Sequence, residues 1–367
     1  MTKKISLIFH GLKRSLSVTY KQFGKHSGPL LKQKTSFFNE NEKHVIRQRK
    51  ISSVYIKQPL RVNCKNCNYG LRSEVDFLKD EIGYKICETC GHLNGTYEDT
   101  AEFCDFVYSG DSGEEYALNY EVDSIAKYSY RLSSIYSPKA EFLYSSLLNC
   151  GANPHDLSYF DFGSGSGYFV GALKQFELSS VTGSEVSSYQ VEYGNSMLGS
   201  PLLSVHDLDE TNDVLRSTNS NVVSLVGVLE HVYDPRAVMR ELQINNNVEY
   251  VFLSVPVFSL SVFIEILNKD LFHRHLHGGH THLYTKQSLH YLANEFDFEI
   301  ASEWWFGADI VDLYRSIFVD LTSKGVSESL MENFQGMMGP LIDRMQLEID
   351  KNEVASEVHM LLRKKGN

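Results

Sequence analysis

The segment LSYFDFGSGSG, residues 157–167, decides the fold of this 367-residue chain. Its first six residues, 157–162, have the apolar and aromatic content of a short buried strand. The strand runs directly into GSGSG, and residues 168–176 predict a helix. A strand, a glycine-rich turn and a helix form the opening unit of a doubly wound α/β sheet. The glycines let the backbone approach a ligand, and the helix N-terminus offers free N–H groups.

An acid, Asp161, stands at the end of this strand, where it can accept a hydrogen bond from a ligand ammonium. A dinucleotide site instead needs the helix start clear for pyrophosphate. The string DFGSGSG resembles the first motif of the class I methyltransferases that use S-adenosylmethionine (SAM). The resemblance implies a Rossmann-like, doubly wound SAM-binding domain. Its expected cofactor contacts in this turn are Asp161, Gly163, Ser164, Gly165 and Gly167.

Later strands extend the resemblance. Residues 181–185 predict a second strand that ends in Glu185, 22 positions after Gly163, where an acid can bind both ribose hydroxyls. The alternative for Glu185 is a solvated loop acid. Residues 202–208 resemble the third strand, where Asp207 could accept from the adenine amino group and the Leu208 backbone could contact the ring. Asp207 is alternatively a helix cap or turn acid.

The fourth strand and its loop, residues 221–235, contain VLEHVYDP, and residues 250–256 predict a fifth strand. Ligands bind beyond the carboxyl ends of such strands, where Glu230 and His231 lie. His231 could remove a proton from the methyl acceptor, with Glu230 orienting the histidine or the substrate. The alternative is structural: His231 bonds a backbone carbonyl and Glu230 caps a helix.

Five histidines fall within residues 273–282. We expect His273, His275 and His277 to face water, whereas the segment around His280 and His282 resembles the one that returns a histidine to the active site in many methyltransferases. Two mechanisms therefore compete. In the first, His231 is the base without a metal. In the second, Glu230, His231 and His280 bind a divalent ion, as in small-RNA 3′-end 2′-O-methyltransferases, although Gly227 stands where those enzymes carry a further Glu.

Two cysteine pairs precede this region: Cys64 with Cys67, and Cys87 with Cys90. Two CxxC turns separated by about twenty residues predict a closed, structural Zn²⁺ site around a small β-hairpin. His92 is a possible substitute ligand, and four free thiols are the alternative.

Such a zinc domain ahead of a Glu-His pair resembles the zinc-containing sugar C-methyltransferases and methyltransferases found with surface-polysaccharide assembly. The resemblance implies a sugar or nucleotide-sugar acceptor, His231 as base, and an assisting tyrosine for which Tyr116 and Tyr120 are candidates. The C-methyltransferases carry a further C-terminal α/β domain, whereas about 57 residues follow Ile310 in this sequence, so C- and O-methylation both stay open. Two different functions stay open as well, an RNA 2′-O-methyltransferase and a non-catalytic SAM-binding scaffold.

Composition and charge set the remaining expectations. The net charge of −11 argues against broad nucleic-acid binding, and we find neither a signal peptide nor a spanning segment, so a cytoplasmic protein is expected. Residues 1–50 hold twelve Lys or Arg and two acids, hence +10, which suits either a solvated tail, an accessory helical segment or a phosphate-binding arm.

The expected organisation has five parts. They are a basic arm (1–55), a zinc-binding domain (56–105), a Tyr-rich connection (106–138), the SAM domain (139–310) and C-terminal helices (311–367). The tyrosines of the connection could line a substrate cleft or pack between domains. Apolar residues from Leu341 to Leu361 recur roughly at helical spacing, which favours a core face or a homodimer contact.

Overall fold

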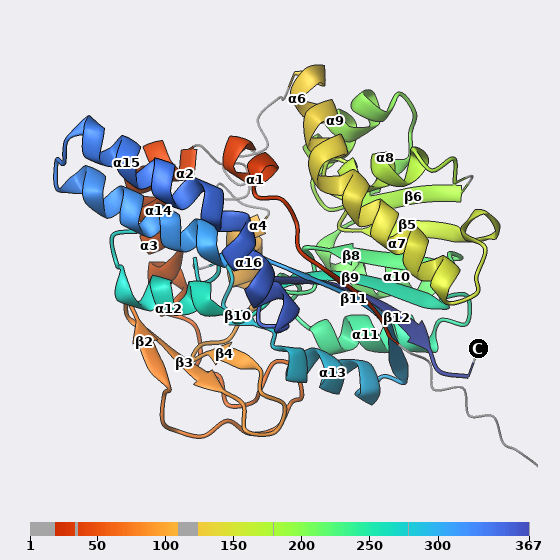
Figure 1. The fold of residues 1–367 in the computed structure, drawn as a ribbon. Helices are drawn as coiled ribbons and strands as arrows, with labels where there is room; N and C mark the ends of the chain where they lie inside the picture. Colours follow the sequence, from red (N-terminus) through yellow and green to blue (C-terminus); the bar gives the residue numbers. More distant parts are fainter. Residues whose placement is uncertain (1–18, 34–35, 109–123, 179, 278, 367) are drawn as a thin grey trace, which may run out of the picture.

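The computed structural model describes residues 19–33, 36–108, 124–178, 180–277 and 279–366. Eight strands form its main sheet in the order β1-β11-β12-β9-β8-β5-β6-β7 (Figure 1). The bounds are β1 Tyr20–Phe23, β5 Ser158–Phe162, β6 Ser180–Glu185, β7 Leu203–Val205, β8 Val222–Val226, β9 Tyr250–Pro256, β11 Phe298–Phe306 and β12 Glu357–Lys364. The sheet is mixed, because β12 runs antiparallel to both of its neighbours while the other pairs are parallel.

Helices cover both faces of this sheet (Figure 1), which confirms the expected α/β architecture. One face carries α7 Ser137–Asn149, α8 Tyr168–Lys174 and α9 Ser188–Leu198, and the other carries α10 Thr211–Ser217, α11 Pro235–Ile244 and α13 Lys286–Glu295. Each face has its own apolar core. Phe142 and Phe169 pack on Phe252 from the first side, and Met239 and Leu289 share a buried cluster with the strands on the second.

The end of the chain differs from the expected run of helices. Helices α14 Asp309–Ser323, α15 Glu328–Met338 and α16 Ile342–Lys351 are followed by β12, which lies between β11 and β9. Val358 and Leu361 are therefore strand residues. The sequence HMLL within β12 is buried on both faces of the sheet, and such a strand gives a continuous apolar run that spacing alone does not distinguish from a helix.

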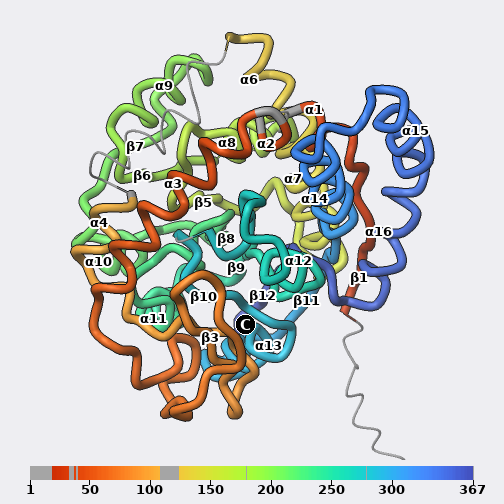
Figure 2. Tube along the Cα trace, turned by 90° about the vertical axis from the view of Figure 1, so that its left-hand side faces the viewer, coloured from red at the N-terminus to blue at the C-terminus, as the bar shows by residue number. Residues whose placement is uncertain are grey.

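A second, antiparallel sheet surrounds the cysteine pairs in the order β10-β4-β3-β2. Its strands are β2 Phe77–Lys79, β3 Ile82–Ile86, β4 Leu93–Gly95 and β10 His282–Leu283. The expected hairpin is β2–β3. The fourth strand, however, comes from the histidine-rich segment far along the chain, and both views place it beside β2–β4 (Figure 1 and Figure 2). The cysteine region is thus joined to the main fold by strand pairing.

The described part of the basic arm is structured. It contributes β1 to the edge of the main sheet and then forms α1 Gly28–Gln33, α2 Ser36–Asn39 and α3 Asn41–Tyr55. Tyr55 is fully buried and donates a hydrogen bond to the Tyr97 carbonyl at 2.5 Å. From residue 19 onward, the accessory-segment interpretation therefore fits better than a solvated tail, whereas residues 1–18 lie outside the described residues.

The connection between the cysteine region and the main sheet contains α4 Ala101–Tyr108, α6 Ile125–Arg131 and a π-helical turn, Leu132–Tyr136. Tyr116 and Tyr120 lie outside the described residues. Helix α12 Leu260–Leu267 packs against α14 and, more lightly, against β2. Across the described ranges, no helix combines the length and apolar character needed to cross a membrane.

Candidate active site

The glycine turn after β5 has the backbone that its sequence predicts. Gly163 has a φ of +68°, and a Cβ on it would lie 2.6 Å from a methyl of Val228. Gly167 has a φ of +73° and precedes the first residue of α8, where a Cβ would meet Leu198 and Leu203 at 2.9 Å. Side chains at these positions would strain the backbone and collide with their neighbours, so the tight turn depends on glycine.

A pocket of about 610 Å³ opens over this turn. Its walls come from the carboxyl ends of β5, β6 and β8, the segment after β7, the loop that contains His231, and α4. Ligands of open α/β sheets bind at this edge of the sheet. The pocket brings together most of the predicted cofactor residues, namely Asp161, Gly163, Ser164, Gly165, Glu185 and Leu208. Gly167 lies beneath it at the helix start.

Glu185 is fixed beside the glycine turn. Its Oε2 accepts a hydrogen bond from the Gly165 N–H at 2.9 Å, and its Oε1 accepts from the N–H groups of Val186 at 2.9 Å and Ser187 at 3.2 Å. The residue is buried and lines the pocket, so it is not a solvated loop acid. These three N–H donors fix the orientation of the carboxyl group toward the pocket.

Asp161 lies deeper in the pocket. Ser224 donates a hydrogen bond from Oγ to its Oδ1 at 2.6 Å, and burial raises the pKa of the carboxyl group to about 7. A buried acid of this kind gains from a cationic ligand, because a nearby positive charge favours the carboxylate over the neutral acid.

The two residues predicted to bind adenine after the third strand, Asp207 and Leu208, differ in their position relative to the pocket. Leu208 lines the pocket, whereas Asp207 is not among the lining residues and is exposed at the start of a 3₁₀ turn. There its backbone N–H donates to the Glu210 carboxylate at 3.1 Å, as expected of a turn acid. His206, which the sequence reasoning missed, lines the pocket instead and its ring lies 5.0 Å from that of Phe162.

Glu230, His231 and His280 come together beside the pocket, which His231 lines. One ligand-type atom from each lies within 4.8 Å of the others, and His231 Nε2 is 3.9 Å from Glu230 Oε1. Burial raises the pKa of Glu230 to about 8 and holds the pKa of His231 well below its usual range, with His280 adding to the latter effect. The cluster is therefore close to neutral around pH 7.

The histidine-rich loop is more buried than expected. His273 and His275 are almost fully enclosed, so the prediction that they face water was wrong. His273 contacts Gln48 and the Asn268 carbonyl, and His275 lies 3.5 Å from Glu265. Gln48 comes from α3, 225 positions earlier, and Glu265 from α12, the helix before the loop, so the spacing of the histidines alone does not identify these partners.

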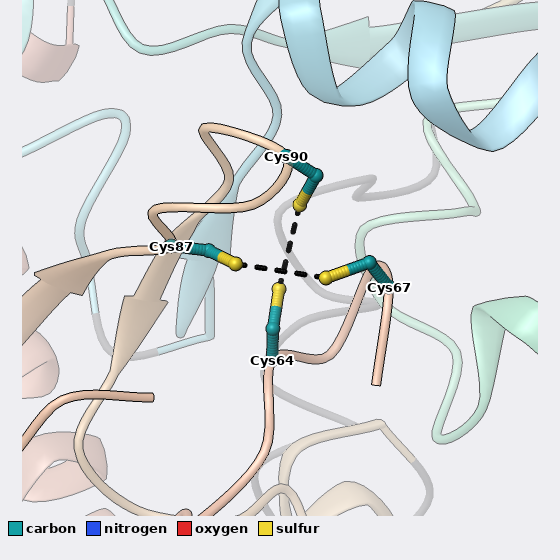
Figure 3. A group of neighbouring side chains, drawn as sticks. All are labelled: Cys64, Cys67, Cys87 and Cys90. Carbon is teal, nitrogen blue, oxygen red and sulfur yellow. Dashed lines mark hydrogen bonds between the residues drawn. The ribbon is translucent and has the colours of Figure 1, made fainter. Parts of the chain in front are cut away.

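The four cysteine sulfurs point toward a common centre (Figure 3). The Sγ atoms of Cys64 and Cys90 are 3.7 Å apart, those of Cys67 and Cys87 are 3.5 Å apart, and all four lie within 4.8 Å of one another. Zinc–sulfur bonds of about 2.3 Å in a tetrahedron give sulfur–sulfur distances of about 3.8 Å, so the cluster has the size of a zinc site.

Neighbouring side chains complete this cluster. Amide groups of Asn66 and Asn94 donate toward the sulfurs of Cys90 and Cys64, each at 3.5 Å. Both ring nitrogens of His92 have other partners, because Nδ1 lies 3.3 Å from Oγ of Ser288 and Nε2 lies 2.9 Å from Nδ1 of His282. The described structure therefore favours the four cysteines over His92 as a ligand set.

One segment of the chain matches a known protein family. Residues 137–303 match the family model described as methyltransferase domain. This segment is a methyltransferase domain. The protein is accordingly an enzyme. No curated protein matches the chain.

Solved methyltransferase structures resemble the chain at low identity. The methyltransferase domain of bacterial CtHen1-C is 13% identical, with 62% of this chain and 97% of that chain covered and a TM-score of 0.40. The plantazolicin methyltransferase BpumL with SAH is 14% identical, with 71% and 93% covered and a TM-score of 0.44. Magnesium protoporphyrin IX methyltransferase (ChlM) from Synechocystis PCC 6803 with SAH is 12% identical, with 72% and 100% covered and a TM-score of 0.44.

The cysteine cluster lies outside the matched segment but is attached to the methyltransferase domain. Asn66 donates from Nδ2 to the Ser288 carbonyl at 3.0 Å, and Arg236 donates from Nη1 to the Asn66 carbonyl at 2.9 Å. The His92–His282 contact joins the same two regions. The cluster therefore contacts the segment that carries His280.

The aromatic connection contributes in both of the ways that the sequence left open. Tyr136 lines the pocket of the methyltransferase domain, and its ring stacks on that of Tyr168 at 5.2 Å. Tyr128 is buried, and its hydroxyl donates to the Ser166 carbonyl at 3.0 Å. Tyr128 thus stabilises the glycine turn through a hydrogen bond to its backbone.

Proposed function

We propose that the protein transfers a methyl group from SAM to a hydroxyl or carbon of a sugar or nucleotide-sugar acceptor, with His231 as general base. One observation carries the proposal: His231 lines the same pocket as the glycine turn and Glu185, so acceptor and cofactor sites adjoin. When bound, SAM supplies an electrophilic methyl group on its sulfonium.

Several residues would hold SAM. Glu185 would accept hydrogen bonds from the ribose hydroxyls, and Asp161 would face the ammonium of the methionine part. The backbone of the turn at Gly163, Gly165 and Gly167 would allow close approach. The adenine would lie near His206 and Leu208, within reach of Asp207 at the adjoining turn. The burial of Asp161 and Glu185 in one pocket supports this orientation.

His231 is suited to accept a proton. Its lowered pKa keeps the imidazole neutral at physiological pH, so that a lone pair is available. The Glu230 carboxyl group, with Oε1 3.9 Å from Nε2, would orient the ring or the acceptor as the proton moves to His231. The support for a sugar is the combination of a four-cysteine cluster with a Glu-His pair, and Tyr136 offers an aromatic wall for the ring of the acceptor.

Transfer of a labelled methyl group to a panel of sugars, nucleotide sugars, glycan fragments and RNA tests the function. Label recovered in a sugar or nucleotide sugar is the expected result. Label recovered only in RNA or peptide would overturn the acceptor assignment and leave the methyltransferase domain unaffected.

The metal-assisted RNA 2′-O-methyltransferase is the second candidate, because Glu230, His231 and His280 form a compact three-ligand group. A divalent ion there would favour the carboxylate form of Glu230 and would polarise two neighbouring hydroxyls. Gly227, with a φ of +70°, offers no fourth ligand. Activity that is lost on chelation and restored by Mn²⁺ or Mg²⁺ would favour this mechanism over the metal-free one.

We further propose that the four cysteines bind one structural Zn²⁺. Their sulfur–sulfur distances and the two amide donors support it. Four thiolates would leave no position for a substrate, so the ion would stabilise the fold without taking part in methyl transfer.

A homodimer through the C-terminal helices and a cytoplasmic location also stay proposals. Partly exposed apolar residues on α15 and α16 support the dimer; they are Leu330, Met337 and Met345. A single species at monomer mass in light scattering would contradict the dimer.

A further inference from the structure

Two lysines occupy the carboxyl edge of the main sheet on the side of α7. Lys25 follows β1, at the point where the Gly24 N–H donates to the Trp305 carbonyl at 3.1 Å. Lys139 lies in the first turn of α7, and its Nζ is 5.1 Å from the centre of the Tyr136 ring. Tyr136 lines the pocket over the glycine turn, so Lys139 adjoins one of the wall residues of that pocket.

Among the described residues, no carboxylate forms a hydrogen bond or an ion pair with the ammonium group of Lys25 or Lys139. Lys25 faces aromatic rings, with its Nζ 4.9 Å from the centre of Phe306 and 6.0 Å from that of Trp304. Lys139 is only 8% exposed. An enclosed lysine without a partner is rare in proteins, because removing an ammonium from water is costly.

Nearby acids do not supply the missing charge. Glu357 is the carboxylate that acts on both lysines, but it pairs with Arg274 at 3.5 Å. Asp161 and Glu230 also act on Lys139, but neither forms an ion pair with it within the described ranges. The pKa of Lys25 is lowered to about 8, by burial and then by Lys139, which shows that the two cations act on one another.

We propose that Lys25 and Lys139 form an anion-binding subsite that holds a phosphate group of the methyl acceptor. The inference rests on the proposed function, because it takes the acceptor to enter the pocket next to SAM. A phosphate brings the negative charge that the two lysines lack. Lysine binds phosphate as a point charge, whereas carboxylates are more often held by the planar fork of arginine. The acceptor is therefore a phosphorylated or diphosphate-linked molecule.

His359 gives an independent indication that this region takes a polar ligand. It is fully buried, and both of its ring nitrogens lack a hydrogen-bond partner within the described ranges. Its ring lies 4.6 Å from that of Phe306, which Lys25 also contacts. Buried polar atoms without partners are uncommon in native structures and are often satisfied by a ligand or water.

Calorimetry on the full-length protein tests the subsite with pyrophosphate as the probe. Wild type is expected to bind it, and Lys25→Met and Lys139→Met are each expected to weaken binding by about tenfold, as for the loss of one charge-assisted contact. Lys139→Arg keeps the charge and should retain most of the affinity. Lys324→Met removes an exposed lysine and is the matched control. Affinity for SAH should be unchanged in Lys25→Met.

A second arm separates an acceptor-borne phosphate from a free anion. Glucose 1-phosphate should compete with pyrophosphate, and glucose should not. Wild type that fails to bind pyrophosphate, or a double methionine variant that binds it as wild type does, would overturn the subsite. If Lys139→Met does not fold, the affinity of Lys25→Met for pyrophosphate tests the subsite, and affinity equal to that of wild type would overturn it. If wild type does not bind SAH, the proposed function is refuted, whatever the result with pyrophosphate.

Discussion

The Nδ1 atom of His280 lies 2.9 Å from the carbonyl oxygen of His275. A carbonyl can only accept, so Nδ1 carries the proton and Nε2 of the neutral ring keeps its lone pair. Burial lowers the pKa of His280 to about 4, which keeps the ring neutral. The loop thus fixes the tautomer of His280 beside Glu230 and His231, an orientation suited to either proposed mechanism.

Glu265 on α12 is predicted to position this loop. Its carboxylate accepts the N–H groups of His275 at 2.8 Å and Leu276 at 3.0 Å. Glu265→Ala should lower the free energy of unfolding by on the order of 3 kcal/mol, because it leaves buried donors and His275 without their partner. Urea denaturation measures this change. Amide exchange should also accelerate at residues 275–276 while SAH affinity is kept; Glu102→Gln, on an exposed position of α4, is the control. Unchanged exchange would contradict the positioning role.

Glu185 is predicted to provide much of the affinity for the nucleoside. Glu185→Ala should weaken SAH binding by about 10- to 100-fold, since it removes a charged acceptor from a buried site. Glu192→Ala, an exposed acid on α9, should bind SAH as wild type does. Calorimetry gives both affinities. Equal affinities in the two variants would remove Glu185 from the cofactor site.

Asp161 is predicted to make stability depend on pH in the absence of SAM. Its folded pKa of about 7 lies above the usual value of 3.8, so the folded state holds the proton more tightly. The folded state is then favoured at low pH and loses stability as pH rises from about 4 to about 7. Asp161→Asn removes this penalty. Relative to wild type, the variant should gain a few kcal/mol across that range, at ~1.4 kcal/mol per pKa unit, and no more above it. Denaturation curves from pH 4 to 9 test the sign; a constant difference would contradict it.

The cofactor half of the fold was predictable from local sequence. The strand, glycine turn and helix at residues 158–174, the acid at Glu185 and the cysteine pairs are all signals carried by adjacent residues. Features set by distant contacts were missed. His275 is buried against Glu265, and β10 pairs with β4. The apolar residues within 358–361 lie in a strand between β11 and β9, not in a helix. Local periodicity contains no information about such partners.

The cysteine cluster is predicted to bind about one zinc per chain and to stabilise the fold. Cys64→Ser should lose the metal and lower Tm, because the two CxxC turns would lose their common centre. Cys150 is a partly buried cysteine outside the cluster, and Cys150→Ser should keep the bound metal and the Tm of wild type. Elemental analysis and thermal unfolding measure these quantities. Wild type purified without chelators and free of zinc would rule out the site.

His231 and His280 separate the two mechanisms. His231→Ala should abolish turnover, by at least ~100-fold as expected for loss of a general base, and should leave SAH affinity intact because the cofactor contacts lie elsewhere in the pocket. His155→Ala, an exposed histidine, is the control. If His231 acts without a metal, His280→Ala should retain measurable turnover that chelators do not affect. If Glu230, His231 and His280 bind an ion, His280→Ala should be as inactive as His231→Ala, and chelation should abolish the activity of wild type. Full activity in His231→Ala would exclude both mechanisms.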